Sequence, residues 1–160
     1  MKLEKLVTDV SAALKKRGLK LVTAESCTGG GLSYWLTSLP GSSEVFDRGY
    51  VAYSNPSKVE SLSVSPITID HHGAVSEDTV CEMAEGALHK SHADVSIAIT
   101  GIAGPDGGTP DKPVGTVWIA WAWNDKPTVA KVNIYPGNRE EVRNGAMITA
   151  LEELLWMLEM

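Results

Sequence analysis

Several residue types that mark other protein classes are scarce in this chain of 160 residues. It has two cysteines, Cys27 and Cys81, which lie far apart and form no CxxC pattern. This scarcity argues against a disulfide framework and favours a reducing compartment, which we take to be the cytoplasm. The four histidines, at positions 71, 72, 89 and 92, show no metal-ligand spacing, so no metal site is predicted.

Long apolar runs and long basic runs are also missing. No segment approaches the ~18 consecutive apolar residues of a membrane span. The first ten residues, MKLEKLVTDV, carry acidic side chains and are not typical of a secretory signal. The net charge is −6, and the one basic cluster, Lys15 to Arg17, falls at the end of a predicted helix, where cations suit the helix dipole. We therefore expect neither a membrane nor a nucleic-acid partner.

The composition and the apolar pattern predict a single α/β domain over residues 1–160. Apolar residues make up 43% of the chain, which is ordinary globular usage. Apolar periodicity predicts helices at 3–14, 32–39, 58–62, 79–89 and from 138 onward, and strands at 19–23, 45–54, 94–100, 114–123 and 128–135. Ser76 and Asn138 are expected N-caps. This order predicts a three-layer α/β/α sandwich with a mixed, mostly parallel sheet, in which the last two strands form an antiparallel hairpin.

The segment TAESCTGG, from Thr23 to Gly30, joins a predicted strand to a predicted helix. A helix N-terminus offers unpaired N–H groups and partial positive charge, so a hydroxyl or thiol there lies beside donors for an oxyanion or a phosphate. Ser26 and Cys27 are the candidate nucleophiles. The alternative is a polar turn whose glycines only permit close packing.

Three more groups stand near the ends of predicted elements. They are Tyr53 with Lys58, the loop TGIAGPDGG from Thr100, and GNREEVR from Gly137. Three of the four groups, all except the one from Gly137, lie where a strand gives way to a turn. In α/β sheets, ligands bind outside the carboxyl ends of strands, so these turns are expected to converge on one crevice. The alternatives are ordinary ones. Tyrosine and lysine near a helix start are often solvated, the loop is neither a Walker A motif nor a dinucleotide fingerprint, and Arg139 and Arg143 could pair with neighbouring glutamates.

Six motifs in this order resemble the CinA C-terminal domain family of nicotinamide-nucleotide amidases. They are TAESCTGG, PGSS (residues 40–43), YSNPSK (53–58), GAVS (73–76), TGIAGPDGG (100–108) and KPVGTV (112–117). The resemblance implies a Rossmann-like fold and hydrolysis of the carboxamide of nicotinamide mononucleotide to nicotinic acid mononucleotide and ammonia, with no cofactor. Ser63 stands where the family commonly has glycine, and Asn138 where it commonly has aspartate. The chain is similar to the stand-alone members, which lack a second domain.

The resemblance also implies roles for individual residues. The family's Ser/Lys chemistry falls on Ser26 and Lys58, with Tyr53 assisting. A serine hydroxyl needs an adjacent base, and a buried lysine becomes one when its pKa is lowered. Cys27 is the rival nucleophile, and Glu25 is expected to orient Lys58 or the leaving ammonia. The expected substrate-binding residues are Thr28, Gly29, Gly30, Ser43, Thr100, Gly101, Gly104, Arg139 and Arg143.

Three hypotheses of function remain open from the sequence. The first is the Ser/Lys amidohydrolase acting on a small pyridine mononucleotide. The second is a nucleotide-binding module that has lost turnover. The third is an interaction protein that docks a partner through an exposed hairpin carrying Trp118, Trp121 and Trp123, although strand alternation puts at least one side of that hairpin in the core. A homo-oligomer formed through that sheet edge is expected and is compatible with the first two.

Overall fold

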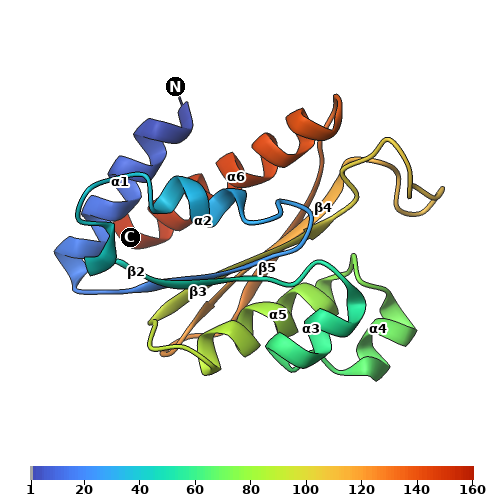
Figure 1. Ribbon diagram of the computed structural model, residues 1–160, viewed down its shortest axis with the longest axis horizontal. Coiled ribbons are helices and arrows are strands. Elements are labelled where there is room, and N and C mark those ends of the chain that lie inside the picture. The colour runs from blue at the N-terminus through green and yellow to red at the C-terminus, as the bar shows by residue number, and fades with distance from the viewer. Residues whose placement is uncertain (1) are drawn as a thin grey trace.

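A five-stranded sheet forms the middle layer of the protein, as the computed structural model shows for residues 2–160 (Figure 1). The strand order is β2-β1-β3-β4-β5. The strands are β1 (Leu21–Glu25), β2 (Phe46–Val51), β3 (Val95–Gly101), β4 (Thr116–Trp123) and β5 (Val129–Ile134). The helices are α1 (Lys2–Arg17), α2 (Gly31–Leu36), η1 (Ser42–Glu44, a 3-10 turn), α3 (Asn55–Leu62), α4 (Pro66–His72), α5 (Glu77–His89) and α6 (Arg139–Glu159).

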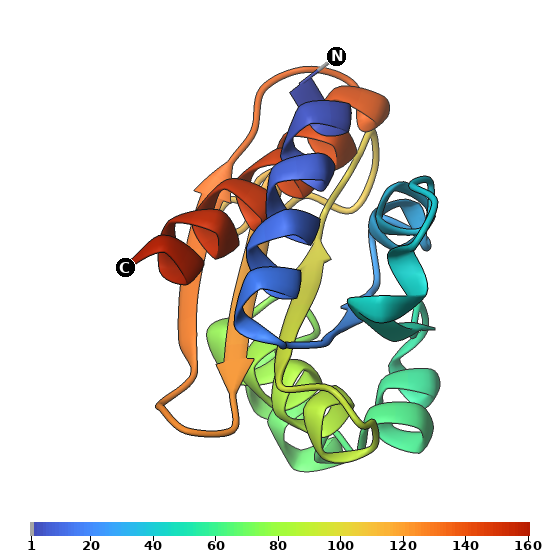
Figure 2. The same ribbon diagram turned by 90° about the vertical axis from the view of Figure 1, so that its left-hand side faces the viewer.

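Helices cover both faces of this sheet. Helices α1, α2 and α6 lie on one face, with α1 packed against α6, and α3, α4 and α5 lie on the other (Figures 1 and 2). Strand β1 pairs in parallel with β2 and β3, whereas β4 pairs antiparallel with β3 and β5. Only β4 therefore runs against the other four strands, and the predicted three-layer α/β sandwich with a mixed sheet is confirmed.

Strand alternation divides the core into two parts. The side under α1, α2 and α6 receives large residues such as Leu21, Ile97 and Ile99, while the side under α5 receives small ones such as Ala24 and Ala98. Successive strand residues point to opposite faces, so each strand contributes to both layers. The alanines let α5 approach the sheet closely.

The hairpin of β4 and β5 is part of this core. Trp121 is fully buried and its indole N–H donates to the carbonyl oxygen of Ala150 in α6 at 3.1 Å. Trp123 is also buried, and Trp118 packs half-buried on the opposite face. The expectation that at least one side of the hairpin is core is confirmed. Because the tryptophans are buried or half-buried, they do not form the exposed surface that the docking hypothesis needs.

Some element boundaries differ from the predicted ones. Helix α4 was not predicted, because PITIDHH contains no buried residue and so shows no apolar periodicity, although Ser65 caps it and Pro66 starts it. Strand β1 continues to Glu25 instead of ending at Thr23, because Glu25 still pairs with Val51 and Ile99. Helix α2 ends early, where the hydroxyl groups of Thr37 and Ser38 donate to carbonyl oxygens of the preceding turn.

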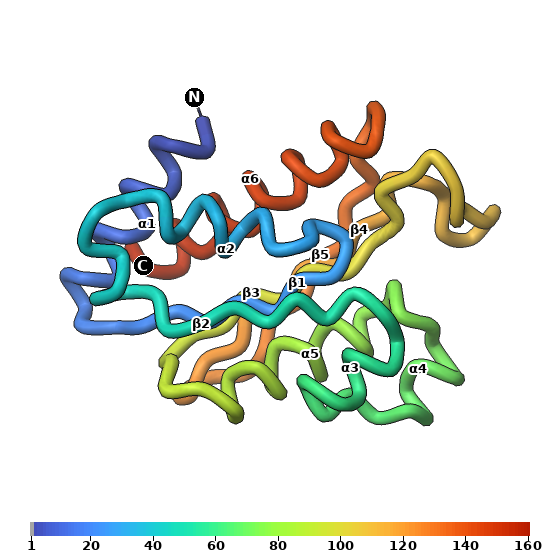
Figure 3. The backbone as a smooth tube through the Cα atoms, viewed as in Figure 1, coloured from blue at the N-terminus to red at the C-terminus, as the bar shows by residue number. Residues whose placement is uncertain are grey.

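The N-caps at Ser76 and Asn138 are confirmed, and Asn138 forms a capping box with Glu141. The chain between β3 and β4, residues 102–115, projects past the end of the sheet (Figure 3). Within residues 2–160, no helix is both long and apolar enough to cross a membrane.

The packing of α3 on α5 generates a stability prediction at Gly86. A Cβ atom added there would collide with the backbone carbonyl of Leu62, the last residue of α3. Alanine normally stabilises a helix interior by about 1 kcal/mol relative to glycine. We expect Gly86→Ala instead to destabilise the protein by about 1–3 kcal/mol, measured by urea unfolding. His89→Ala, at the exposed end of the same helix, is the control, and a stabilised Gly86→Ala would contradict the close contact.

Candidate active site

A pocket of about 240 Å³ opens at the carboxyl ends of β1 and β3. Each of the four groups singled out in the sequence sends at least one residue into it. Its lining comes from the β1–α2 turn, the β2–α3 turn with α3, the α4–α5 turn, the β3 end and the start of α6. The residues are Ser26, Cys27, Tyr53, Asn55, Lys58, Ala74, Val75, Thr100, Gly101, Ala103 and Arg139. The expected convergence of the three strand-end turns on one crevice is therefore confirmed, and the start of α6 joins them through Arg139.

Ser26 and Lys58 are in direct contact in this pocket. The Lys58 Nζ atom lies 3.0 Å from Ser26 Oγ and donates to the Tyr53 carbonyl oxygen at 3.0 Å. Helix α3 holds the lysine there, because Ser54 caps the helix and Lys58 follows one turn later. The Lys58 side chain is only 1% exposed, and burial lowers the pKa of its ammonium group. In residues 2–160 it forms no ion pair with a carboxylate.

Tyr53 takes part through two different groups. Its backbone carbonyl accepts from Lys58 and, at 3.4 Å, from the Ser26 hydroxyl. Tyr53 as a residue is 60% exposed, and its phenolic oxygen accepts from Arg139 at 3.2 Å. The other side of the Arg139 guanidinium donates to the Gly104 carbonyl at 2.7 Å. The carbonyl of Tyr53 therefore positions Ser26 and Lys58, while its phenol positions Arg139.

The buried carboxylate of Glu25 organises the turn that carries Ser26. It accepts from the Thr28 hydroxyl at 2.6 Å, from the Ser33 hydroxyl at 2.6 Å and from the backbone N–H groups of Leu32 and Ser33. These N–H groups belong to the first turn of α2, where carboxylates are stabilised by the helix dipole. Glu25 makes no hydrogen bond to Lys58 among the described contacts, so its observed role is to fix the β1–α2 turn.

Cys27 lines the pocket but is a poor candidate for the nucleophile. Its thiol is buried, and burial raises the pKa of Cys27 to about 11. The nearby Arg143 and Lys58 side chains act in the opposite direction and do not outweigh burial. Since the thiolate is the reactive form of cysteine, Cys27 is almost entirely protonated near neutral pH.

The glycine-rich loop after β3 forms one wall. Thr100 is buried and its hydroxyl donates to the Ala74 carbonyl at 3.0 Å, which ties β3 to the α4–α5 turn. At Gly101 a Cβ atom would lie 2.7 Å from Val117. At Gly104 the backbone has φ +87°, which favours glycine, and a Cβ would lie 2.5 Å from Val114. The loop can therefore take its path only with glycine at these positions.

Arg139 and Arg143 also line a second cavity beside the pocket, of about 450 Å³, together with Glu140, Asn144 and Met147. Arg143 donates to the Thr28 carbonyl at 3.0 Å, and its guanidinium lies close to Gly29. Neither arginine forms an ion pair within the described chain. The neighbouring glutamates thus leave both positive charges uncompensated.

Ser43 is not brought to this site. It lies in η1, before β2 begins, whereas Tyr53 follows the end of the same strand. Its carbonyl accepts from the Lys20 ammonium, which precedes β1. Ser43 is therefore at the opposite end of the sheet, and the expectation that it contributes to the same pocket is wrong.

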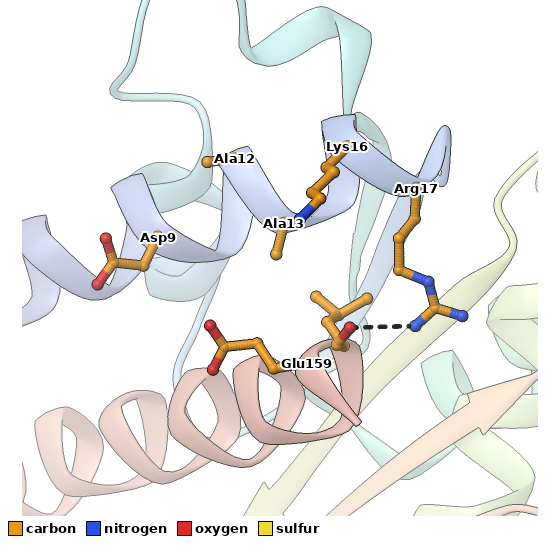
Figure 4. A pocket seen from close by; sticks show the side chains of 7 residues that line it. Asp9, Ala12, Ala13, Lys16, Arg17 and Glu159 are labelled. Atoms are coloured by element: carbon orange, nitrogen blue, oxygen red, sulfur yellow. Dashed lines mark hydrogen bonds between the residues drawn. The ribbon is translucent and has the colours of Figure 1, made fainter.

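A cavity of about 580 Å³, larger than the pocket, lies far from these groups. It separates the second half of α1 from the end of α6 (Figure 4) and is lined by Asp9, Ala12, Ala13, Lys16, Arg17, Leu158 and Glu159. Arg17 donates to the Leu158 carbonyl at 3.4 Å, so its charge interacts with the carboxyl end of α6. This cavity is lined by charges of both signs and contains no serine, threonine or cysteine. The larger volume of this cavity therefore does not make it the candidate active site.

Comparison with known proteins identifies the family. The model of the CinA C-terminal domain matches residues 3–158. The chain belongs to the CinA C-terminal domain family. It is 47% identical over 154 residues to the nicotinamide-nucleotide amidohydrolase PncC of Enterobacter agglomerans, covering 96% of this chain and 94% of that protein. It is also 47% identical over 152 residues to the protein of the same name from Escherichia coli K12, covering 95% and 92%.

Solved structures of the family have the same fold. The competence/damage inducible protein CihA from Agrobacterium tumefaciens superposes with a TM-score of 0.96 at 40% identity, covering 100% of this chain and 97% of that one. The competence damage-inducible protein A from Klebsiella pneumoniae gives a TM-score of 0.94 at 39% identity, covering 98% and 97%.

Sequence reasoning missed several pocket residues of this CinA-family chain. Ala74, Val75 and Ala103 line the pocket without any chemical signature of their own. Asn55 also lines it and stands inside the YSNPSK motif, where the preceding tyrosine and the following lysine drew attention instead. The four-fold hydrogen bonding of Glu25 was missed too, although a glutamate before a helix start is a recognisable capping signal.

The Glu25 network generates a prediction about the active-site turn. Glu25→Gln keeps the side-chain shape but places an amide N–H₂ among four donors, so we expect a loss of about 2–4 kcal/mol in the free energy of unfolding. Urea unfolding measures it, and Glu60→Gln, on the exposed side of α3, is the control. Equal stability of the Glu25 and Glu60 variants would contradict a structural role for this carboxylate.

Proposed function

We propose that the chain is an amidohydrolase that cleaves the carboxamide of nicotinamide mononucleotide, giving nicotinic acid mononucleotide and ammonia through a Ser26–Lys58 mechanism. The names of the two bacterial relatives support the reaction. The single observation that carries the mechanism is the 3.0 Å contact between Lys58 Nζ and Ser26 Oγ inside a pocket. Nucleophile and base within hydrogen-bond reach is the geometry that covalent catalysis requires.

In the proposed mechanism Lys58 is the base in its neutral form. It takes the Ser26 proton as Oγ attacks the carboxamide carbon, then returns a proton to the nitrogen so that ammonia leaves and an acyl-serine forms. Water activated by the same amine completes the hydrolysis. The oxyanion needs N–H donors. The amide of Gly29 already donates to the Ser26 carbonyl, so the amides of Thr28 and Gly30 are the donors of this turn that no described residue engages.

Substrate recognition follows from the two arginines. A net charge of −6 repels a phosphate unless local cations offset it. Arg139 lines the 240 Å³ pocket and the adjoining 450 Å³ cavity, so it stands where a ligand with its carboxamide at Ser26 would extend. We propose that Arg139 binds the phosphate, with Arg143 and the backbone of the Thr100–Gly104 loop contributing.

A binding module without turnover is the second candidate. It would have the same pocket and arginines, but it would need no buried lysine against a serine hydroxyl. Burying the Lys58 amine away from water costs free energy, and a protein that only binds its ligand gains nothing from that cost. The observed contact therefore favours catalysis.

The proposal extends to assembly and location. Strand β5 lies at the edge of the sheet and exposes Val132 and Ile134, the latter to 64%. An unpaired edge can pair with the same edge of a second copy, and we propose a homo-oligomer formed in this way.

Cys27 and Cys81 are both unpaired thiols, which supports a reducing location such as the cytoplasm.

The nucleophile is tested by a pair of substitutions at adjacent positions. We expect Ser26→Ala to lower the rate of ammonia release by at least about a thousandfold and Cys27→Ala to retain most of it, because the Cys27 thiol is protonated. Ammonia release from nicotinamide mononucleotide is the measurement, with unfolding curves to show that both variants fold. Activity of Ser26→Ala within tenfold of the parent would refute the assignment.

The base is tested by pH dependence. The lowered pKa of Lys58 means that its neutral fraction rises with pH at lower values than for an exposed lysine, so kcat/KM should increase with pH along an acidic limb whose midpoint lies below 10.5. Lys58→Arg should be inactive, since guanidinium does not deprotonate. An active arginine variant would mean that the position supplies only positive charge.

Phosphate recognition is tested by comparing two substrates. Arg139→Ala should lower kcat/KM for the mononucleotide by about 10- to 100-fold, the value of a charged hydrogen bond, and should affect the dephosphorylated riboside far less. Arg17→Ala, which removes an arginine far from the pocket, is the matched control. An equal loss on both substrates would assign Arg139 to the support of Tyr53 and Gly104 alone.

A further inference from the structure

One polar side chain of the pocket is used neither by the fold nor by the proposed mechanism. Lys58 is engaged by Ser26 and Tyr53, Thr100 by Ala74, and Arg139 by Gly104 and Tyr53. Asn55 is an exposed residue that lines the same pocket, and its side-chain amide has no hydrogen-bond partner within residues 2–160, so it is free to bind a ligand. The helix does not require it either, since Ser54 caps α3.

The chemistry of this amide complements that of a primary carboxamide. An asparagine side chain offers an oxygen acceptor and two N–H donors, whereas an arginine or a charged lysine can only donate. The N–H₂ of a primary carboxamide needs an acceptor. The Tyr53 carbonyl, another acceptor of this pocket, already receives Lys58 and Ser26.

We infer that Asn55 is a specificity-determining residue whose Oδ1 accepts an N–H of the substrate carboxamide and so selects primary amides over esters. This inference rests on the proposed function for the identity of the ligand. Asn55 is separated from Lys58 by less than one turn of α3, so a nitrogen bound by Asn55 lies toward the amine that protonates it as the C–N bond breaks. Asn55 thus contributes to holding the leaving group in its reactive orientation.

The experiment measures ligand binding without turnover. In a Ser26→Ala background, calorimetry compares nicotinamide mononucleotide with the methyl ester of nicotinic acid mononucleotide, which has the same acyl group and no N–H. We expect a preference for the amide that falls about tenfold when Asn55→Ala is added. Asn55→Asp keeps an acceptor oxygen and should keep the preference, and Glu60→Ala, on the same helix and outside the pocket, is the control.

The outcomes separate this inference from the proposed function. An amide preference unchanged by Asn55→Ala, or lost equally in Glu60→Ala, would overturn the role of Asn55. An Asn55-dependent preference in a chain whose parent releases no ammonia would support the role of Asn55 and overturn the amidase. Failure of both ligands to bind would overturn both.

Discussion

The mechanism we propose depends on keeping a lysine nitrogen inside the protein without a carboxylate beside it. Most buried ammonium groups are stabilised by an ion pair, and without one the neutral form is favoured. Lys58 instead has two oxygen neighbours, the Ser26 hydroxyl and the Tyr53 carbonyl. A carboxylate beside Lys58 would stabilise the charged ammonium form and so remove the basicity of the amine. The absence of an ion pair at Lys58 within the described chain is therefore what the chemistry we propose requires.

The carboxylate next to Ser26 in the sequence, Glu25, is hydrogen-bonded within its own turn and not to Lys58. Four donors from the β1–α2 turn surround it, and this arrangement fixes the backbone around Ser26 while leaving Lys58 unpaired. Arg143 reaches the same turn from α6 through the Thr28 carbonyl. The turn that carries Ser26 is therefore held from two sides by charged groups that do not themselves contact the Ser26 hydroxyl. A rigid site of this kind suits the preorganised catalysis we propose.

The sequence predicted the layers, the strand positions and the convergence of Ser26, Lys58, Tyr53 and Arg139, because strand alternation and turn residues are local signals. It did not predict α4, none of whose residues is fully buried, or the position of Ser43, since a motif does not say which end of a strand it occupies. Helix α3, which carries Lys58, packs on α5 at Gly86 through a long-range contact that no local pattern indicates. The hydrogen bonds that Lys58 and Ser26 donate to the Tyr53 carbonyl involve a backbone atom, which every residue type has. The residue type at position 53 therefore could not predict them.

The central claim of the mechanism we propose is that Lys58 acts as a base because burial lowers its pKa. The most direct test is NMR titration of the lysine side chains labelled with 13C at Cε, with Lys58→Arg used to assign the signal. The account predicts that Lys58 titrates at clearly lower pH than is usual for lysine side chains. A Lys58 signal that titrates in the usual range would contradict it.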